Sequence, residues 1–89
     1  MQRRPFVEAV ADGLEGCLVR NDTKPAWEKQ SVFEVGVKML EEYSEFMEAI
    51  FADDEEAIQR EGFDLIASVA MVMAKHGFGN PEWVRGREA

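Results

Sequence analysis

The sequence contains one cysteine and one histidine among its 89 residues. A single cysteine, Cys17, cannot form an intramolecular disulfide bond, and no group of cysteines and histidines has the spacing of a zinc site. One thiol in a chain without disulfides is typical of a reducing compartment, so we expect a cytoplasmic protein. A glycine-rich phosphate loop of the Walker type is absent as well.

Basic residues and long apolar runs are also scarce. Lys and Arg number 10 against 18 Asp and Glu, giving a formal net charge of −8. Phosphate backbones are bound by clustered Lys and Arg, so we expect no nucleic-acid partner, and a phosphate-bearing ligand should need a metal as mediator. Glu8, Asp12 and Glu15 interrupt what would be the apolar core of a signal peptide, and no run of about 18 uncharged apolar residues follows. We expect no membrane partner.

Helical periodicity is what the sequence does contain. Three segments have it: residues 5–18, residues 31–52, and the segment from the turn at 53–54 to about His76. Either Asp53 or Asp54 can cap the third helix, and Gly77 is a favoured residue just beyond a helix end. Asn80, followed by a proline, predicts one or two further turns at 80–84.

No alternating strand pattern, internal repeat or low-complexity tract interrupts these helices. We therefore predict a single all-α domain over residues 1–89, built as a small helical bundle around a long antiparallel helix hairpin. The region at 30–78 holds the motifs described next, and residues 80–89 form a short C-terminal helix or tail.

Acidic residues are concentrated on the two helices of the predicted hairpin. Glu42 and Glu45 lie one turn apart on the first helix, and Glu61 and Asp64 lie one turn apart on the second. Counted outward from the turn at 53–54, Glu45 is level with Glu61 and Glu42 with Asp64 to within about 1.5 Å. The spacing therefore allows four carboxylates to converge at one height.

Two interpretations of these carboxylates remain open from spacing alone. An i, i+3 acidic pair is commonly a solvated helix face. Four converging carboxylates with few cations nearby would repel one another, whereas divalent cations would make the same arrangement favourable. Oxygen ligands without histidine or thiolate favour Mg²⁺, with Mn²⁺ as a possible substitute.

The segments "KMLEEYSEFMEAI" at 38–50 and "EGFDLIASVAMVMA" at 61–74 resemble the MazG-like, all-α nucleoside triphosphate pyrophosphohydrolases, whose signature is EExxE followed by ExxD. The match covers roughly residues 30–78. "KPAWEKQSVFEVGVKMLEE" and "KHGF" are more loosely similar to phosphoribosyl-ATP pyrophosphatases.

The resemblance implies a set of catalytic residues and a reaction. It implies that four carboxylates ligate Mg²⁺: Glu42, Glu45, Glu61 and Asp64. Glu41 would be a supporting group or would position and deprotonate water. The implied reaction is attack of water between the α- and β-phosphates of a nucleotide substrate, which yields a nucleoside monophosphate and pyrophosphate. A phosphoribosyl-ATP pyrophosphatase-like reaction is the alternative within the same class.

Substrate contacts are less defined by the sequence. Lys38 could contact a phosphate or pair with Glu42 or Glu34, and Trp27, in a loop predicted at 21–27, could stack on a base. Both are candidate substrate-binding residues.

Assembly follows from the apolar residues. "LIASVAMVMA" at 65–74 is apolar almost all round, and a bundle this small cannot cover every side of it. On the preceding helix, apolar residues line one side: Phe33, Val37, Leu40, Met47 and Phe51. We expect a homodimer, or a dimer of dimers as in related enzymes. A noncatalytic, dimeric helical module that binds a partner through its acidic face is the alternative from a different functional class.

Overall fold

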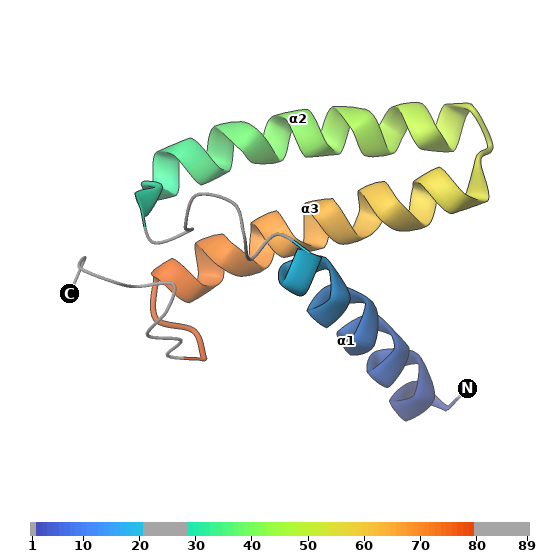
Figure 1. Ribbon diagram of the computed structural model, residues 1–89, viewed down its shortest axis with the longest axis horizontal. Coiled ribbons are helices and arrows are strands. Elements are labelled where there is room, and N and C mark those ends of the chain that lie inside the picture. Colours follow the sequence, from blue (N-terminus) through green and yellow to red (C-terminus); the bar gives the residue numbers. More distant parts are fainter. Residues whose placement is uncertain (1, 21–28, 80–89) are drawn as a thin grey trace.

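A computed structural model of the protein describes residues 2–20 and 29–79. This part of the chain forms three helices and no strand: α1 (Arg3–Arg20), α2 (Val32–Phe51) and α3 (Glu55–Lys75) (Figure 1). The all-α prediction is confirmed, and the arrangement fits a helical bundle. The loop predicted at 21–27, Trp27 within it, and the short helix predicted at 80–84 lie outside the described residues.

A capping box begins α2. The Ser31 hydroxyl accepts a hydrogen bond from the Glu34 backbone N–H at 3.0 Å, and the Glu34 carboxylate accepts one from the Ser31 backbone N–H at 3.4 Å. Two backbone donors at the helix start are thereby satisfied. This pairing also assigns Glu34 to the cap.

A short turn connects α2 to α3. Ala52 ends α2, Asp53 adopts a positive φ of 53°, and Asp54 caps α3 by accepting a hydrogen bond from the Ala57 backbone N–H at 3.1 Å. Glu55 and Glu56 follow in the first turn of α3, where negative charge complements the helix dipole. Of the two aspartates that could cap this helix, Asp54 does so.

The end of α3 is a glycine cap, as predicted. His76 ends the helix and Gly77 follows with φ of 97°, a conformation that costs a residue with a Cβ far more than it costs glycine. The Gly77 N–H donates to the Ala74 carbonyl at 2.9 Å, and the Phe78 N–H donates to the Met73 carbonyl at 3.0 Å. These paired bonds satisfy carbonyls that the helix end would otherwise leave open.

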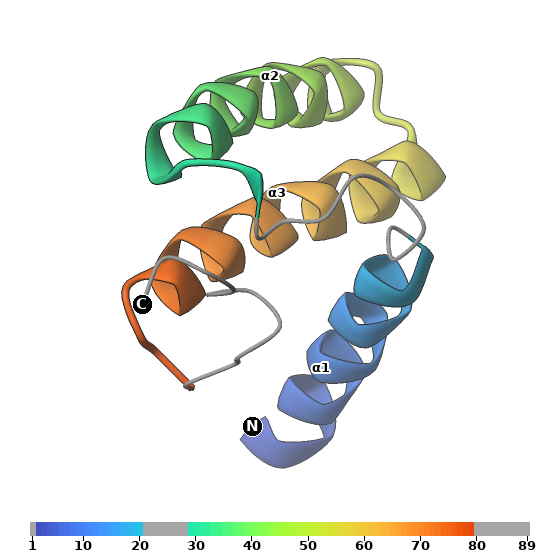
Figure 2. The same cartoon turned by 60° about the vertical axis from the view of Figure 1, so that its left-hand side comes forward.

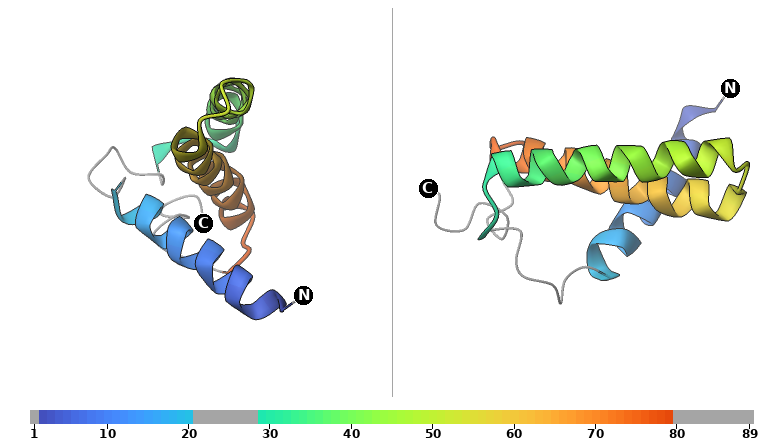
Figure 3. Two further views of the ribbon diagram at one scale, coloured as in Figure 1. Left: turned by 90° about the vertical axis from the view of Figure 1, so that its right-hand side faces the viewer. Right: turned by 90° about the horizontal axis from the view of Figure 1, so that it is seen from above.

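Helices α2 and α3 lie side by side, and the chain reverses direction between them (Figures 1 and 3). The side of α2 that packs inward repeats every seven residues, with Val35, Glu42 and Ala49 all buried. Val35 packs in the core with Met71 and Ala74 of α3. Glu42 therefore occupies the middle of a row that is otherwise apolar.

Helix α1 crosses α3 on the side away from α2 (Figures 2 and 3). It extends from Arg3 to Arg20, longer than the predicted 5–18, and its second half makes the contact: Cys17 is fully buried and Leu18 packs against the core. A Cβ at Gly13 would overlap the Phe63 ring, so glycine is what allows the two helices to approach at this point. Near the other end of α1, Phe6 is exposed.

The opposite side of α2 carries large apolar residues that no described element covers. Phe33 is 79% exposed, Leu40 70% and Phe51 82%. On α3, Ile66, Val69 and Met73 are each about two-fifths exposed, at 40%, 40% and 43%. Among the described residues, no helix is both long and apolar enough to traverse a lipid bilayer.

Candidate metal centre

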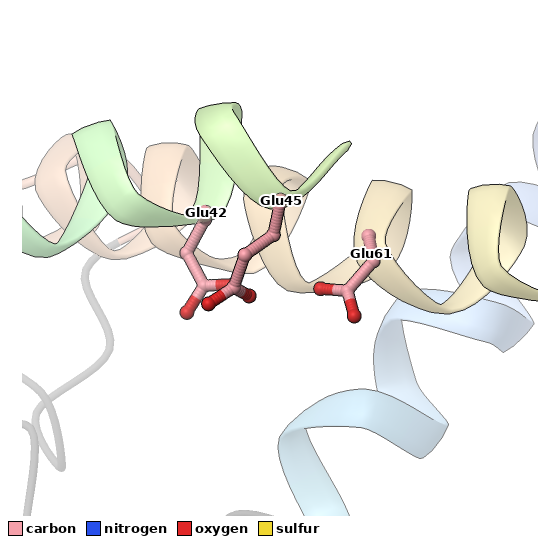
Figure 4. Close-up of side chains that lie close together, drawn as sticks. All are labelled: Glu42, Glu45 and Glu61. Carbon is pink, nitrogen blue, oxygen red and sulfur yellow. The ribbon is translucent and has the colours of Figure 1, made fainter. Parts of the chain in front are cut away.

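Three glutamates converge where α2 and α3 pack together. Glu42 and Glu45 come from successive turns of α2 and Glu61 from α3, and one carboxylate oxygen of each lies within 4.8 Å of those of the other two. Figure 4 shows the three side chains projecting to the same side of the helix pair. Residues from two separate motifs, EExxE and ExxD, are thus brought together by the turn at 52–54.

Two of the three glutamates are at least partly buried, which is costly for a metal-free protein, whereas Glu45 is exposed. Glu42 is only 9% exposed, and Glu61 is partly buried. One oxygen of each, Glu42 Oε2 and Glu61 Oε2, is buried without a hydrogen-bond donor among the described residues. A buried polar atom left unsatisfied costs about 1–3 kcal/mol, and more when it is charged.

The remaining oxygens of the two buried glutamates face cations at the rim of the site. Lys38 Nζ lies 3.6 Å from Glu42 Oε1, and Arg60 Nε lies 3.5 Å from Glu61 Oε1. Both basic side chains are more than half exposed, so water screens these ion pairs. The rim therefore offsets only part of the negative charge.

Two of the glutamates hold their protons more tightly than usual. The pKa of Glu42 is raised from its ordinary value of 4.5, first because burial removes water from the carboxylate and second because Asp64 is negatively charged; Lys38 opposes the rise. The pKa of Glu45 is raised by the charge of Glu42 and by a hydrogen bond with Glu61. Mutual repulsion of this kind is what a divalent cation would reverse.

Asp64, the fourth predicted ligand, lies one turn beyond Glu61 on α3 and is not part of this group. Its Oδ1 accepts a hydrogen bond from the Cys17 thiol of α1 at 3.4 Å. Burial, this hydrogen bond and the charge of Asp64 raise the pKa of Cys17, so the thiol stays protonated and able to donate. The structure thus brings three of the four predicted ligands together and places the fourth against α1.

The other predicted site residues are less closely associated with the carboxylates. Glu41 is exposed on α2, about 100° around the helix from Glu42, and is not in the three-glutamate group. Lys38 makes the ion pair with Glu42, one of the two roles that the sequence left open.

Cys17 was missed as a site residue. The sequence identifies it only as a small, buried, apolar-like side chain. The available signal was Gly13, one turn earlier, because a glycine within a helix can mark a close approach to another helix. Nothing in the sequence specifies that the approaching helix is α3.

The donor set fits a hard divalent cation. It consists of carboxylate oxygens, two of them buried and unsatisfied, with no histidine among the ligands. Mg²⁺ and Mn²⁺ prefer oxygen ligands of this kind, whereas Zn²⁺ and Cu²⁺ prefer sites with imidazole or thiolate.

Comparisons of the chain with models of protein families, with curated proteins and with solved structures give no match. The assignment of a function therefore depends on the residues and geometry of this chain.

Proposed function

We propose that this protein is a Mg²⁺-dependent nucleoside triphosphate pyrophosphohydrolase of the MazG-like all-α class, acting in the cytoplasm. The observation that carries the proposal is the convergence of Glu42, Glu45 and Glu61, with buried oxygens that have no protein donor. A solvated acidic helix face does not explain a carboxylate that is only 9% exposed.

In this proposal the three glutamates hold the cation, and Asp64 supplies the fourth carboxylate. The long antiparallel hairpin predicted over residues 31–76 is the unit that fixes their spacing. When bound, the cation would cancel charge on the substrate phosphates and polarise the attacked phosphorus. No covalent nucleophile is needed for attack by water.

The remaining residues bind and orient the reactants. Glu41, exposed and adjacent to Glu42 in the chain, keeps the two roles predicted for it: a supporting group, or the group that positions and deprotonates the attacking water. Lys38 would exchange its partner Glu42 for a substrate phosphate, which the 51% exposure of its side chain supports. Trp27, which lies outside the described residues, remains a predicted contact for the base.

The proposal includes a homodimer, or a dimer of dimers. Its support is the amount of large apolar surface left open: Phe33, Leu40 and Phe51 on α2, and part of residues 65–74 on α3. Exposed apolar surface of this extent is characteristic of an interaction site. A second copy would cover it.

Pyrophosphate release is the direct test. The wild-type protein would be assayed with a panel of ribo- and deoxyribonucleoside triphosphates and with phosphoribosyl-ATP, in Mg²⁺ and in chelator. Glu42→Gln should lower kcat/KM by about a hundredfold or more, because it removes a ligand from the site. Glu48→Gln, at an exposed position of the same helix, is the matched control and should be active.

The panel also distinguishes the alternatives. Release from phosphoribosyl-ATP alone would indicate the phosphoribosyl-ATP pyrophosphatase-like reaction. A folded, dimeric protein that releases no pyrophosphate from any substrate would overturn the proposal in favour of the noncatalytic module with an acidic face.

A further inference from the structure

The contact between Cys17 and Asp64 joins two helices that are far apart in sequence. Cys17 is fully buried, and its thiol donates to Asp64 Oδ1 at 3.4 Å. Asp64 lies one turn beyond Glu61 on α3, and its charge is one of the causes that raise the pKa of Glu42. A side chain of α1 therefore contacts a carboxylate that lies one turn from Glu61, a member of the three-glutamate group.

Packing around this contact fixes the height of the thiol on α3. Gly13 lies one turn before Cys17, and the Phe63 ring fills the space that a side chain at position 13 would need. Phe63 immediately precedes Asp64. One turn of α1 and one short segment of α3 are thus interlocked at two successive points, which leaves little freedom for the sulfur to move along α3.

The hydrogen bond uses only one oxygen of Asp64. A carboxylate has two oxygens, so the second stays available while Oδ1 is held by the thiol. The neighbouring Glu42 is nine-tenths buried, and its Oε2 has no donor among the described residues. The site therefore has an unsatisfied buried oxygen on one side and an oriented carboxylate beside it.

We propose that Cys17 is a positioning residue of the metal centre: by donating to Oδ1 it orients the Asp64 carboxylate so that the free oxygen serves as a ligand beside Glu42, Glu45 and Glu61. The inference depends on the proposed metal site and goes beyond it, because it gives α1 a role in that site. Carboxylates that ligate metals are generally held by such supporting hydrogen bonds, and loss of one typically lowers metal affinity 10- to 100-fold.

Mn²⁺ binding, followed by electron paramagnetic resonance of the free ion, measures this role without an activity assay. Cys17→Ala should weaken binding about tenfold, the lower end of the usual range, because a thiol is a weak donor. Cys17→Ser retains a donor and should bind within about threefold of the wild type. Thermal unfolding in chelator reports the stability of each variant separately.

A double-mutant cycle with Asp64→Asn tests whether Cys17 affects Mn²⁺ affinity through Asp64. If Cys17 acts through Asp64, Cys17→Ala should cause no further loss of affinity once Asp64→Asn is present. If Cys17→Ala does not fold, Cys17→Val provides a second side chain without a donor. A purely structural role predicts changes in unfolding temperature with Mn²⁺ affinity unchanged.

The outcomes separate this inference from the proposed function. A wild-type protein that binds no Mn²⁺ overturns the metal site itself. A wild-type protein that binds Mn²⁺, with Cys17→Ala binding equally well or with additive losses in the cycle, overturns only the role of Cys17. The role of Cys17 is supported if Cys17→Ala weakens Mn²⁺ binding, Cys17→Ser retains it, and Cys17→Ala has no further effect on affinity in the Asp64→Asn background.

Discussion

Each side of α2 departs in one respect from the pattern of an ordinary surface helix. Its inward row, Val35, Glu42 and Ala49, carries a carboxylate at the centre of an apolar contact. Its outward side exposes Phe33 and Phe51 almost fully. A helix that only had to stabilise a monomer would place charge outside and aromatic residues inside.

Both sides cost the isolated, metal-free chain free energy. On the inward side the cost is an unsatisfied buried charge, and on the outward side it is apolar surface in water. A binding partner on each side of α2 would offset both costs. We propose a divalent cation for the inward side and a second copy of the chain for the outward side.

The largest expected effect comes from making the inward row fully apolar. Glu42→Met should lower pyrophosphate release about a hundredfold or more, and yet stabilise the metal-free protein by about 2 kcal/mol, since an apolar side chain of similar length replaces a buried charge. Activity and thermal unfolding in chelator would be measured side by side.

Glu48→Met, at an exposed position, is the control for this variant and should change neither quantity appreciably. A metal-free Glu42→Met protein that unfolds at a lower temperature than the wild type would contradict the proposal that Glu42 destabilises the folded protein when no cation is bound.

Charging the outward side should separate the proposed dimer. Leu40 is 70% exposed, and Leu40→Lys removes one apolar side chain from each copy, so the dimer dissociation constant should rise about a hundredfold. Sedimentation velocity across a concentration series measures the change, with Glu48→Lys as a lysine control on another side of α2. A wild-type protein that remains monomeric at high concentration would contradict the proposal that a second copy covers the outward side of α2.

A smaller effect is expected from pH. The pKa of Glu42 in the folded protein is raised above its ordinary 4.5, so the folded state binds protons more readily than the unfolded state. The contribution of Glu42 to stability is therefore fully present below pH 4.5 and is lost as pH rises through the raised folded-state pKa. In chelator, unfolding should occur at a lower temperature at pH 7 than at about pH 5.

Two comparisons check the origin of that pH dependence. Saturating Mg²⁺ should reduce it, because bound cation stabilises the ionised carboxylates, and Glu42→Met should reduce it by removing the group. An equal slope in wild type and Glu42→Met would assign the effect to other carboxylates.

The smallest expected effect is a change in stability from a substitution in the turn between α2 and α3, which serves as a reference for the others. Asp53 has a positive φ of 53° in the turn, and Asp53→Gly should stabilise the protein by at most about 1 kcal/mol because glycine adopts this conformation readily. The change touches neither side of α2, so the gain should be the same with and without Mg²⁺. A gain present in only one condition would show that the turn conformation is linked to the metal site.

Local signals made most of the fold predictable. The aspartate cap of α3, the glycine at its end and the extent of α2 all depend on residues within a few positions of one another. The meeting of Glu45 with Glu61 also followed from counting along two helices joined by a short turn. These features need no knowledge of which side of a helix is buried.

Features that depend on packing between distant segments were not predictable. The sequence places Glu41 and Glu42 in one charged stripe, whereas packing against α3 buries Glu42 and leaves Glu41 exposed. Nor does the sequence show that Gly13 is the point where α1 meets Phe63. The hydrogen bond from Cys17 to Asp64 depends on that crossing, which no local pattern specifies.

The turn at 52–54 gives the proposed metal centre a further property. Glu45 and Glu61 reach each other only when α2 and α3 are packed together, so neither helix alone presents the three-glutamate group. A cation that binds the folded chain and not the unfolded one stabilises it by RT ln(1 + [L]/Kd). At concentrations above Kd, the free energy of unfolding would then rise with the logarithm of free Mg²⁺, so that the fraction of folded chains would depend on the magnesium concentration around them.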